Sequence, residues 1–237
     1  RGFTPTPAAL RAAEAARRMR GAAQDIASAA GQEAAEPAGT VRVTASEILA
    51  CYALPAIFTR LAETHPQIQI ELVATNDVSN LLEREADIAI RMGKPRQAGL
   101  IARRMPDVPT GLYAHRNLVA HLGAPQRLED LAPYRLIGYD KSNLIVSGAR
   151  RAKIPLTRDS FAFRCDHQVA CWQMARAGLG VGMLARFVGD ADPAMVRLIP
   201  KLAMQPMPMW LCARREVKTN PRLRIVFDAL AEGLRRL

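Results

Sequence analysis

The segment TVRVTASEILACYALPAIFTRLAETHPQIQIELVAT, residues 40–75, decides the fold class of this chain. Apolar and polar residues alternate over residues 40–45, which is the pattern of a β-strand. A helix is expected over residues 46–66, with a kink or restart at Pro55 because proline lacks the backbone N–H. Residues 68–75 form a second run rich in Ile and Val. Strand, helix and strand in this order predict an α/β fold with parallel pairing.

The same alternation continues along the chain. We expect further strands at residues 86–92, 109–115, 135–140, 159–165, 179–184, 195–199 and 208–215. We expect further helices at residues 79–86, 128–134 and 167–178, and a last one that begins at Asn220-Pro221 and presents residues 223, 226, 227, 230, 234 and 237 as its apolar face. Trp172 and Trp210 are expected in the core, since both stand in apolar runs. The pattern predicts two α/β lobes of similar plan, with residues 38–109 and 209–237 forming lobe I and residues 110–208 forming lobe II.

An Ala-rich helix precedes the first strand. Thr6 is a hydroxyl residue suited to capping a helix, and Pro7 suits its first position. Small and apolar residues recur at positions 12, 15, 19, 22, 26 and 29, a spacing that suits pairing of two helices. Packing of this helix on its own domain is the alternative. Gly31 is expected to end the helix, and a hinge-like break is expected around Pro37 and Gly39.

Composition bounds the class of protein. Hydrophobic residues make up 49% of the chain and charged residues 23%, which is ordinary for a well-cored protein. No stretch approaches the ~20 apolar residues of a membrane helix, so we expect no membrane partner. The net charge of +11 is diffuse, since residues 1–36 hold five arginines against four acids, and it indicates no particular DNA-reading surface.

Four cysteines (Cys51, Cys165, Cys171 and Cys212) occur without CxxC spacing, which suits a reducing cytoplasm. We expect all four to be small buried residues, with a redox-active Cys165–Cys171 pair as the alternative. No histidine stands at ligand spacing from a cysteine, so no metal site is expected. The sequence has no Ser-His-Asp order, no GxSxG and no phosphate-binding glycine loop, so we expect neither a cofactor nor an enzyme.

Three segments, read in order, carry a family resemblance. They are GTVRVTASEILACYALPAIFTRLAETHPQIQIEL at 39–72, LLEREADIAIRMGKPRQAGLIARRM at 81–105 and QMARAGLGVGMLARFV at 173–188, and Phe3-Thr4 precedes them at the head of the first helix. Together they resemble the LysR-type transcriptional regulators, over essentially the whole chain. Two positions depart from the family pattern: Thr6-Pro7 stand where Ala-Gly is frequent, and Ala185 stands where Pro is common.

The resemblance implies an architecture and a function. Residues 1–37 would be the end of a wing and a linker helix, followed by two Rossmann-like lobes of the type II periplasmic-binding-protein plan with a ligand cleft between them. It implies a cytoplasmic, ligand-responsive regulator that forms homodimers or homotetramers and contacts DNA through a winged helix before residue 1. A solute-binding protein of a transport system is the alternative from another class, and an enzyme on the same architecture is a third.

Candidate ligand-binding residues follow from the strand ends, because ligands of open α/β sheets bind beyond the carboxyl ends of strands. The expected ligand-binding residues are Ser46, Glu47, Thr75, Asn76, Asp77, Arg91, Asn143, Asp166 and His167. Asn143 belongs to the polar segment 139–148, which we interpret as a cover over the cleft or as a mobile surface loop.

Each candidate has a structural alternative. Ser46 and Asp166 are suited to capping the helices that follow them, and residues 75–77 to forming a plain turn. Arg91 suits bidentate pairing with a ligand carboxylate, or a salt bridge to Asp77 or Asp87. His167 is either a surface residue or a source of pH-dependent affinity.

The expected charge of the site restricts the effector. Glu47, Asp77 and Asp166 would together repel a dianion, so we expect a mono-anion or an amino-acid-like zwitterion.

Overall fold

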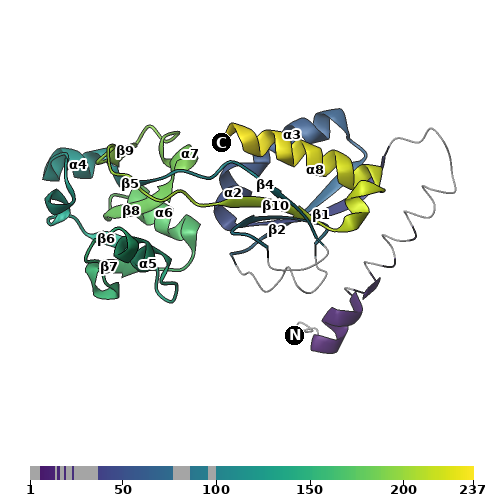
Figure 1. The fold of residues 1–237 in the computed structure, drawn as a ribbon, viewed down its shortest axis with the longest axis horizontal. Helices are drawn as coiled ribbons and strands as arrows, with labels where there is room; N and C mark the ends of the chain where they lie inside the picture. Colours follow the sequence, from purple (N-terminus) through teal and green to yellow (C-terminus); the bar gives the residue numbers. More distant parts are fainter. Residues whose placement is uncertain are drawn as a thin grey trace, which may run out of the picture. The chain divides into compact units, whose positions relative to one another are not determined.

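The computed structural model describes residues 6–13, 15, 16, 19, 23, 37–76, 86–95 and 100–237. The chain divides into two compact units (Figure 1). Unit 1 contains the described residues up to Met105 together with Trp210–Arg236, and unit 2 contains Pro106–Met209. Each unit has one five-stranded sheet with helices, so the prediction of two α/β lobes is confirmed. None of the described helices combines the length and apolarity needed to cross a membrane.

The sheet of unit 1 has the strand order β2-β1-β3-β10-β4. Its strands are β1 (Gly39–Ala45), β2 (Ile68–Ala74), β3 (Ile88–Met92), β4 (Ile101–Arg104) and β10 (Met209–Ala213). β1 pairs in parallel with β2 and β3, as predicted, while β10 and β4 pair antiparallel. β4 was not predicted, because this edge strand alternates between partly exposed and exposed residues and has arginine at two of its four positions.

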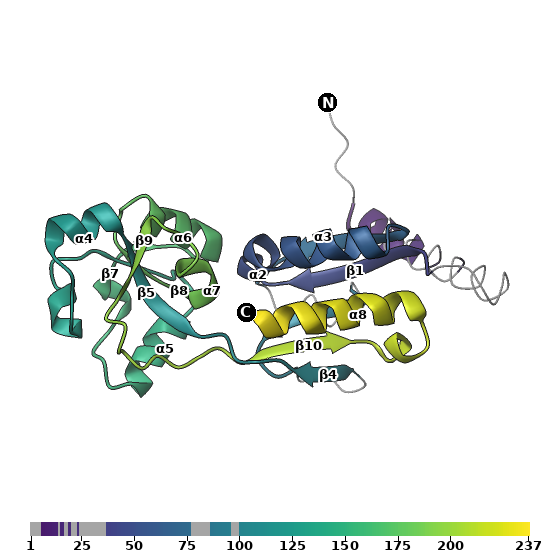
Figure 2. The ribbon, with the colours of Figure 1, turned by 90° about the horizontal axis from the view of Figure 1, so that it is seen from above.

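Three helices complete unit 1: α2 (Glu47–Tyr52), α3 (Leu54–Thr64) and α8 (Pro221–Gly233). The predicted helix 46–66 is thus broken at Ala53, with Pro55 in the first turn of α3. α3 and α8 pack side by side on one face of the sheet (Figure 2). The cap of α8 is confirmed, since the Asn220 side chain accepts from the N–H of Leu223 at 3.3 Å. Its apolar face ends earlier than predicted, because Leu237 is 38% exposed.

The sheet of unit 2 has the strand order β7-β6-β8-β5-β9. Its strands are β5 (Thr110–His115), β6 (Leu136–Gly138), β7 (Phe161–Arg164), β8 (Val181–Ala185) and β9 (Met195–Leu198). β6 is parallel to β7 and β8, and β5 is antiparallel to β8 and β9.

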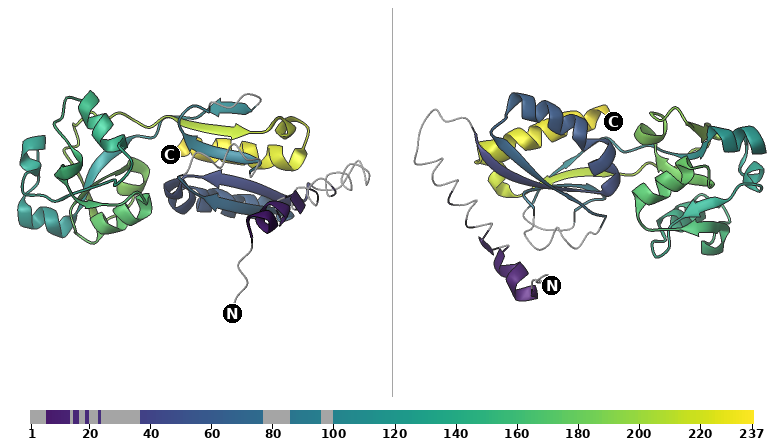
Figure 3. Two further views of the ribbon diagram at one scale, coloured as in Figure 1. Left: turned by 90° about the horizontal axis from the view of Figure 1, so that it is seen from below. Right: turned by 180° about the vertical axis from the view of Figure 1, so that it is seen from behind.

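The helices of unit 2 are α4 (Arg116–Leu122), α5 (Leu144–Arg151), α6 (Gln168–Arg176) and α7 (Arg186–Gly189), shown from two further sides in Figure 3. The segment 139–148 is therefore not a loop throughout, because α5 begins at Leu144. α4 and α7 were not predicted. Short 3-10 turns occur at Leu128–Leu131, Arg158–Ser160, Arg215–Lys218 and Leu234–Arg236.

Two glycines in unit 2 occupy positions that require glycine, and two aromatic residues of its core contact each other. Gly178, which follows α6, has φ +83°, a conformation that favours glycine. A Cβ atom on Gly180 would lie 2.2 Å from the carbonyl oxygen of Arg135, so only glycine fits there. Tyr113, 1% exposed, meets Trp172 edge-on with ring centroids 6.4 Å apart. The prediction that Trp172 belongs to the core is confirmed, whereas Trp210 is only partly buried.

The predicted start of the N-terminal helix is confirmed. Thr6 Oγ1 accepts from the N–H of Ala9 at 3.2 Å, and residues 7–13 are helical. Three positions of the expected pairing stripe, 22, 26 and 29, lie outside the described residues, and so does Gly31. The short helix expected at residues 79–86 also lies outside them, apart from residue 86. The pairing of two such helices stays a prediction.

The cysteines differ from expectation in two cases. Cys171 and Cys212 are buried, as predicted, but Cys51 is exposed and Cys165 is partly exposed. Cys51 lies in α2, where its neighbours Leu49 and Ala50 take the buried positions. Sequence position alone did not show which face of this short helix points outward.

Candidate functional site

The carboxyl ends of three strands in unit 1 bring Thr75, Ser46 and Arg91 into one row. β1 pairs with β2 up to Ala45 and Ala74, and with β3 up to Ala45 and Ile90. The next residue on each strand continues this register, and the N–H of Thr75 still donates to the Ala45 carbonyl at 2.9 Å. The structure thus brings together three of the residues expected from the sequence.

Ser46 precedes α2 but does not cap it. Its side chain makes no hydrogen bond to the helix, so the capping alternative is wrong. The residue is 9% exposed, and its Oγ has no hydrogen-bond partner in the described structure. A buried hydroxyl without a partner carries a desolvation cost of about 1–3 kcal/mol, which an arriving polar ligand would remove.

Glu47 and Asn76 bond to each other. The Asn76 side-chain oxygen accepts from the N–H of Glu47 at 3.3 Å, and its amide nitrogen donates to Glu47 Oε2 at 2.9 Å. These bonds fix the end of β2 against the start of α2. Asp77, the next candidate, lies outside the described residues.

Arg91 is a buried cation without a carboxylate partner among the described residues. It is 8% exposed, and its Nη2 donates to Thr44 Oγ1 at 2.7 Å and its Nη1 to the Ile90 carbonyl at 3.2 Å. Its Nε has no partner. Burial lowers the pKa of the guanidinium from its ordinary value. The expected salt bridge to Asp87 is wrong, since that carboxylate accepts instead from the N–H of Arg42 at 2.8 Å.

Thr44 is a site residue that was not predicted, because it is one of the polar positions in the alternating pattern of β1. It is 2% exposed and also donates to the Val73 carbonyl at 3.1 Å. Its contact with Arg91 follows from the parallel register of β1 and β3, in which Thr44 lies opposite Ala89, two residues before Arg91.

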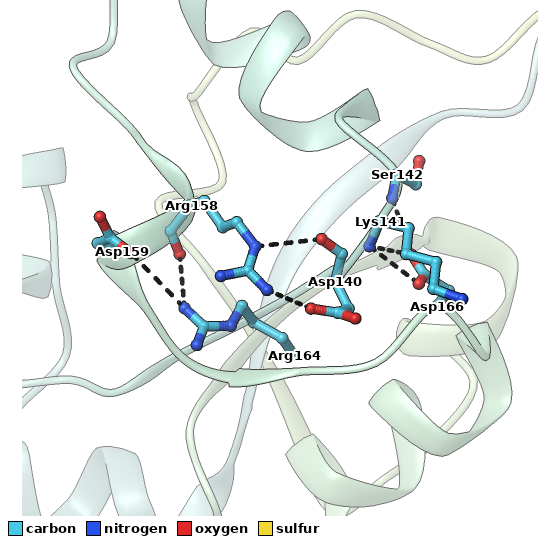
Figure 4. A network of polar contacts seen from close by, with 7 residues as sticks. All are labelled: Asp140, Lys141, Ser142, Arg158, Asp159, Arg164 and Asp166. Carbon is cyan, nitrogen blue, oxygen red and sulfur yellow. Dashed lines mark hydrogen bonds and ion pairs between the residues drawn. The ribbon is translucent and has the colours of Figure 1, made fainter.

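In unit 2, Asp166 holds a turn (Figure 4). Its carboxylate accepts from the backbone N–H of Lys141 at 3.0 Å and of Ser142 at 3.0 Å. These bonds, with that of Ser142 the strongest, lower the pKa of Asp166. The prediction that Asp166 caps α6 is wrong, because His167 does so through Nδ1, which accepts from the N–H of Ala170 at 3.2 Å. His167 therefore caps the N-terminus of α6.

The same turn is held from its other side by Arg158. Figure 4 shows Arg158 paired with the Asp140 carboxylate, and its Nε donates to the Asp140 carbonyl at 3.3 Å. Arg164 in turn donates to the Arg158 carbonyl at 3.3 Å. Asn143 stands exposed at the start of α5 and makes no side-chain cap bond. Asp166 and Arg158 therefore position the segment that leads into α5.

Metal chemistry has no basis in the described part of the chain, where no three His, Cys, Asp or Glu side chains gather as ligands. The geometry instead supplies hydroxyls and a cation suited to binding an anion.

Comparison with known proteins identifies the family. The model of the LysR substrate binding domain matches residues 34–235. The chain belongs to the LysR substrate binding domain family. The resemblance inferred from the sequence is therefore confirmed, and a regulator is favoured over a transport protein. The expected ligand cleft between the two lobes stays a prediction.

Among relatives of this LysR domain, the HTH-type transcriptional regulator CrgA of Neisseria meningitidis serogroup C (strain 8013) is 30% identical over 203 residues, which is 84% of this chain and 68% of CrgA. The HTH-type transcriptional regulator PtxR of Pseudomonas aeruginosa is 25% identical over 170 residues, 70% of this chain and 54% of PtxR.

Solved structures agree on the fold. The CrgA regulatory domain superposes with a TM-score of 0.73 at 25% identity, and the match covers 84% of this chain and 100% of the CrgA domain. The full-length Vibrio cholerae virulence activator AphB superposes with a TM-score of 0.68 at 20% identity, covering 97% of this chain and 81% of AphB. These neighbours have the type II periplasmic-binding-protein fold expected from the sequence.

Proposed function

We propose that this LysR domain senses a small effector that carries a carboxylate, a mono-anion or an amino-acid-like zwitterion, through the row formed by Thr75, Ser46 and Arg91. The observation that carries the proposal is Arg91, a buried guanidinium with an unpartnered Nε and no carboxylate beside it in the described structure. A carboxylate of the effector would complete its hydrogen bonds, since the planar fork of arginine matches a carboxylate bidentately.

Ser46 supports the same site. Its buried hydroxyl lies one strand away from Arg91 at the same register level and lacks a partner in the described structure. Glu47 and Asn76 would then act by holding the neighbouring turn, and Asp166, His167 and Asn143 by shaping the corresponding edge of unit 2. Asp77 remains a candidate from the sequence alone.

The effector would control transcription by binding two arrangements of the regulator with different affinities, because a ligand shifts an equilibrium only by that difference. The regulator would act in the cytoplasm. It would contact DNA through a winged helix that precedes the N-terminal helix. Assembly into a homodimer or homotetramer would use the N-terminal helix, on which Met19 is 74% exposed in the single chain. Sedimentation of a Met19→Glu variant tests that pairing, which predicts a smaller assembly.

The site is tested by screening small carboxylates for thermal stabilisation of the chain, then measuring the best one by calorimetry. Arg91→Gln is expected to weaken its binding at least about tenfold, because the charged contact is lost. Arg222→Gln is the matched control, since Arg222 is an equally buried arginine, 7% exposed, in α8. Equal affinity of wild type and Arg91→Gln would remove Arg91 from the site, and turnover of any bound compound would contradict a non-enzymatic sensor.

A further inference from the structure

Unit 2 contains an apolar pocket that is separate from the Arg91 row. It lies between β6, β8, α6 and the first turn of α5, and its lining includes Ile137, Ile145, Trp172 and Leu184. We propose that this pocket binds an uncharged apolar group of a small molecule, a single ring or a short branched chain, and that α5 is the cover that moves to admit it. The inference does not depend on the proposed anion site.

Small residues form part of the wall of the pocket. Gly182 on β8 and Ala175 on α6 both line it, and a Cβ atom on Gly182 would lie only 3.3 Å from the Ala175 Cβ, so β8 and α6 approach each other closely there. Protein interiors are otherwise packed to crystal-like density, so larger side chains at these two positions would fill the space.

The chemistry of the lining excludes a charged guest, because none of the residues that line this pocket is Asp, Glu, Lys, Arg or His. Burial raises the pKa of Cys171 to about 11, so its thiol stays protonated, and its Sγ donates to the Cys165 carbonyl at 3.0 Å. Burial also raises the pKa of Tyr139 to about 12. The Tyr139 hydroxyl accepts from Gln168 Nε2 at 3.4 Å.

The enclosed space is small while α5 is in place, about 10 Å³, which is room for one water molecule. A ring therefore enters only if α5 moves. α5 is suited to such a movement because none of its residues is buried, and Leu144 is 45% exposed. Few buried contacts mean a low free energy of local opening. The turn before α5 is held by the bonds from Lys141 and Ser142 to Asp166.

Toluene is the probe, titrated into the full chain and followed by methyl NMR. The proposal predicts saturable shifts centred on Ile137, Ile145 and Leu184, with no comparable shift at Leu118 and Leu122, which pack on a different cluster of unit 2. Shifts that never saturate, or that are centred on that other cluster, would overturn it.

Three variants sharpen this test. Gly182→Ala places a methyl group in the pocket and is expected to weaken toluene binding about tenfold or more. Leu122→Ala is the control in unit 2, since Leu122 packs on the other cluster and does not line the pocket, and it should bind toluene as wild type does. Asp166→Ala frees the turn and should speed exchange of bound toluene. The proposal is wrong if a folded Gly182→Ala variant binds toluene with wild-type affinity, or if toluene exchanges at the wild-type rate in Asp166→Ala. If Gly182→Ala does not fold, the positions of the shifted methyl signals in the wild type decide the question.

Discussion

Replacing Arg91 by methionine is expected to stabilise the folded chain while abolishing carboxylate binding. Methionine has a similar length and no charge. The variant loses the hydrogen bonds to Thr44 at 2.7 Å and to the Ile90 carbonyl at 3.2 Å, worth about 1 kcal/mol each. The Thr44 hydroxyl is not orphaned, because it keeps its bond to the Val73 carbonyl at 3.1 Å.

Against that loss stands the cost of burying Arg91 itself. Its unpartnered Nε costs about 1–3 kcal/mol, and the desolvation of a charge without a counter-ion costs several kcal/mol more. The net expectation is a gain of about 1–3 kcal/mol, and each kcal/mol raises Tm by about 2–4 °C in a chain of this size.

Urea unfolding of the variant measures this gain directly. A lower urea midpoint for Arg91→Met than for the wild type would refute the argument that Arg91 provides a binding contact at the expense of stability.

Gly180→Ala is expected to destabilise the chain by about 3 kcal/mol, because its methyl group would overlap a backbone oxygen, whereas Gly148→Ala should stabilise it by about 0.5–1 kcal/mol through helix propensity; thermal unfolding of the two distinguishes crowding from propensity. The pKa of Asp166 is lowered in the folded chain, so its contribution to stability is complete above the ordinary aspartate pKa of about 3.9 and is lost as the pH falls through the folded value. The difference in urea midpoint between wild type and Asp166→Ala should therefore narrow below about pH 4, and a constant difference would contradict this. Iodoacetamide at neutral pH should label the exposed Cys51 well before Cys171, whose pKa burial raises to about 11; mass spectrometry of the native chain reads this, and equal labelling would contradict the burial of Cys171.

Local rules explain what the sequence predicted correctly. β-branched alternation identified β1, and proline placement with a capping side chain identified the starts of the N-terminal helix and α8. These signals depend on neighbours within one turn or one strand. β4 and α5 gave weak signals, because an edge strand with two arginines and a helix that contains serine and glycine do not follow the patterns of buried elements.

The candidate site divides in the same way. Strand ends named Ser46, Thr75 and Arg91, and the register of the sheet brings those three together. The hydrogen-bond partners of the candidate residues could not be predicted from the sequence, because they lie far away along the chain. The Arg91–Thr44 bond joins residues 47 positions apart, and the bonds to Asp166 come from residues 24 and 25 positions before it. Whether a polar side chain caps a helix, holds a turn or waits for a ligand is decided by such long-range contacts.

The position of β10 between β3 and β4 has a consequence for biosynthesis. Unit 2 is one continuous stretch, whereas the sheet of unit 1 lacks its fourth strand until residues 209–213 have left the ribosome. Until then β3 presents a bare edge and β4 has no neighbour to pair with. During synthesis, all residues of unit 2 therefore emerge before the sheet of unit 1 is complete. A chain that stops before residue 209 lacks β10 and leaves the sheet of unit 1 with an open edge, which favours aggregation.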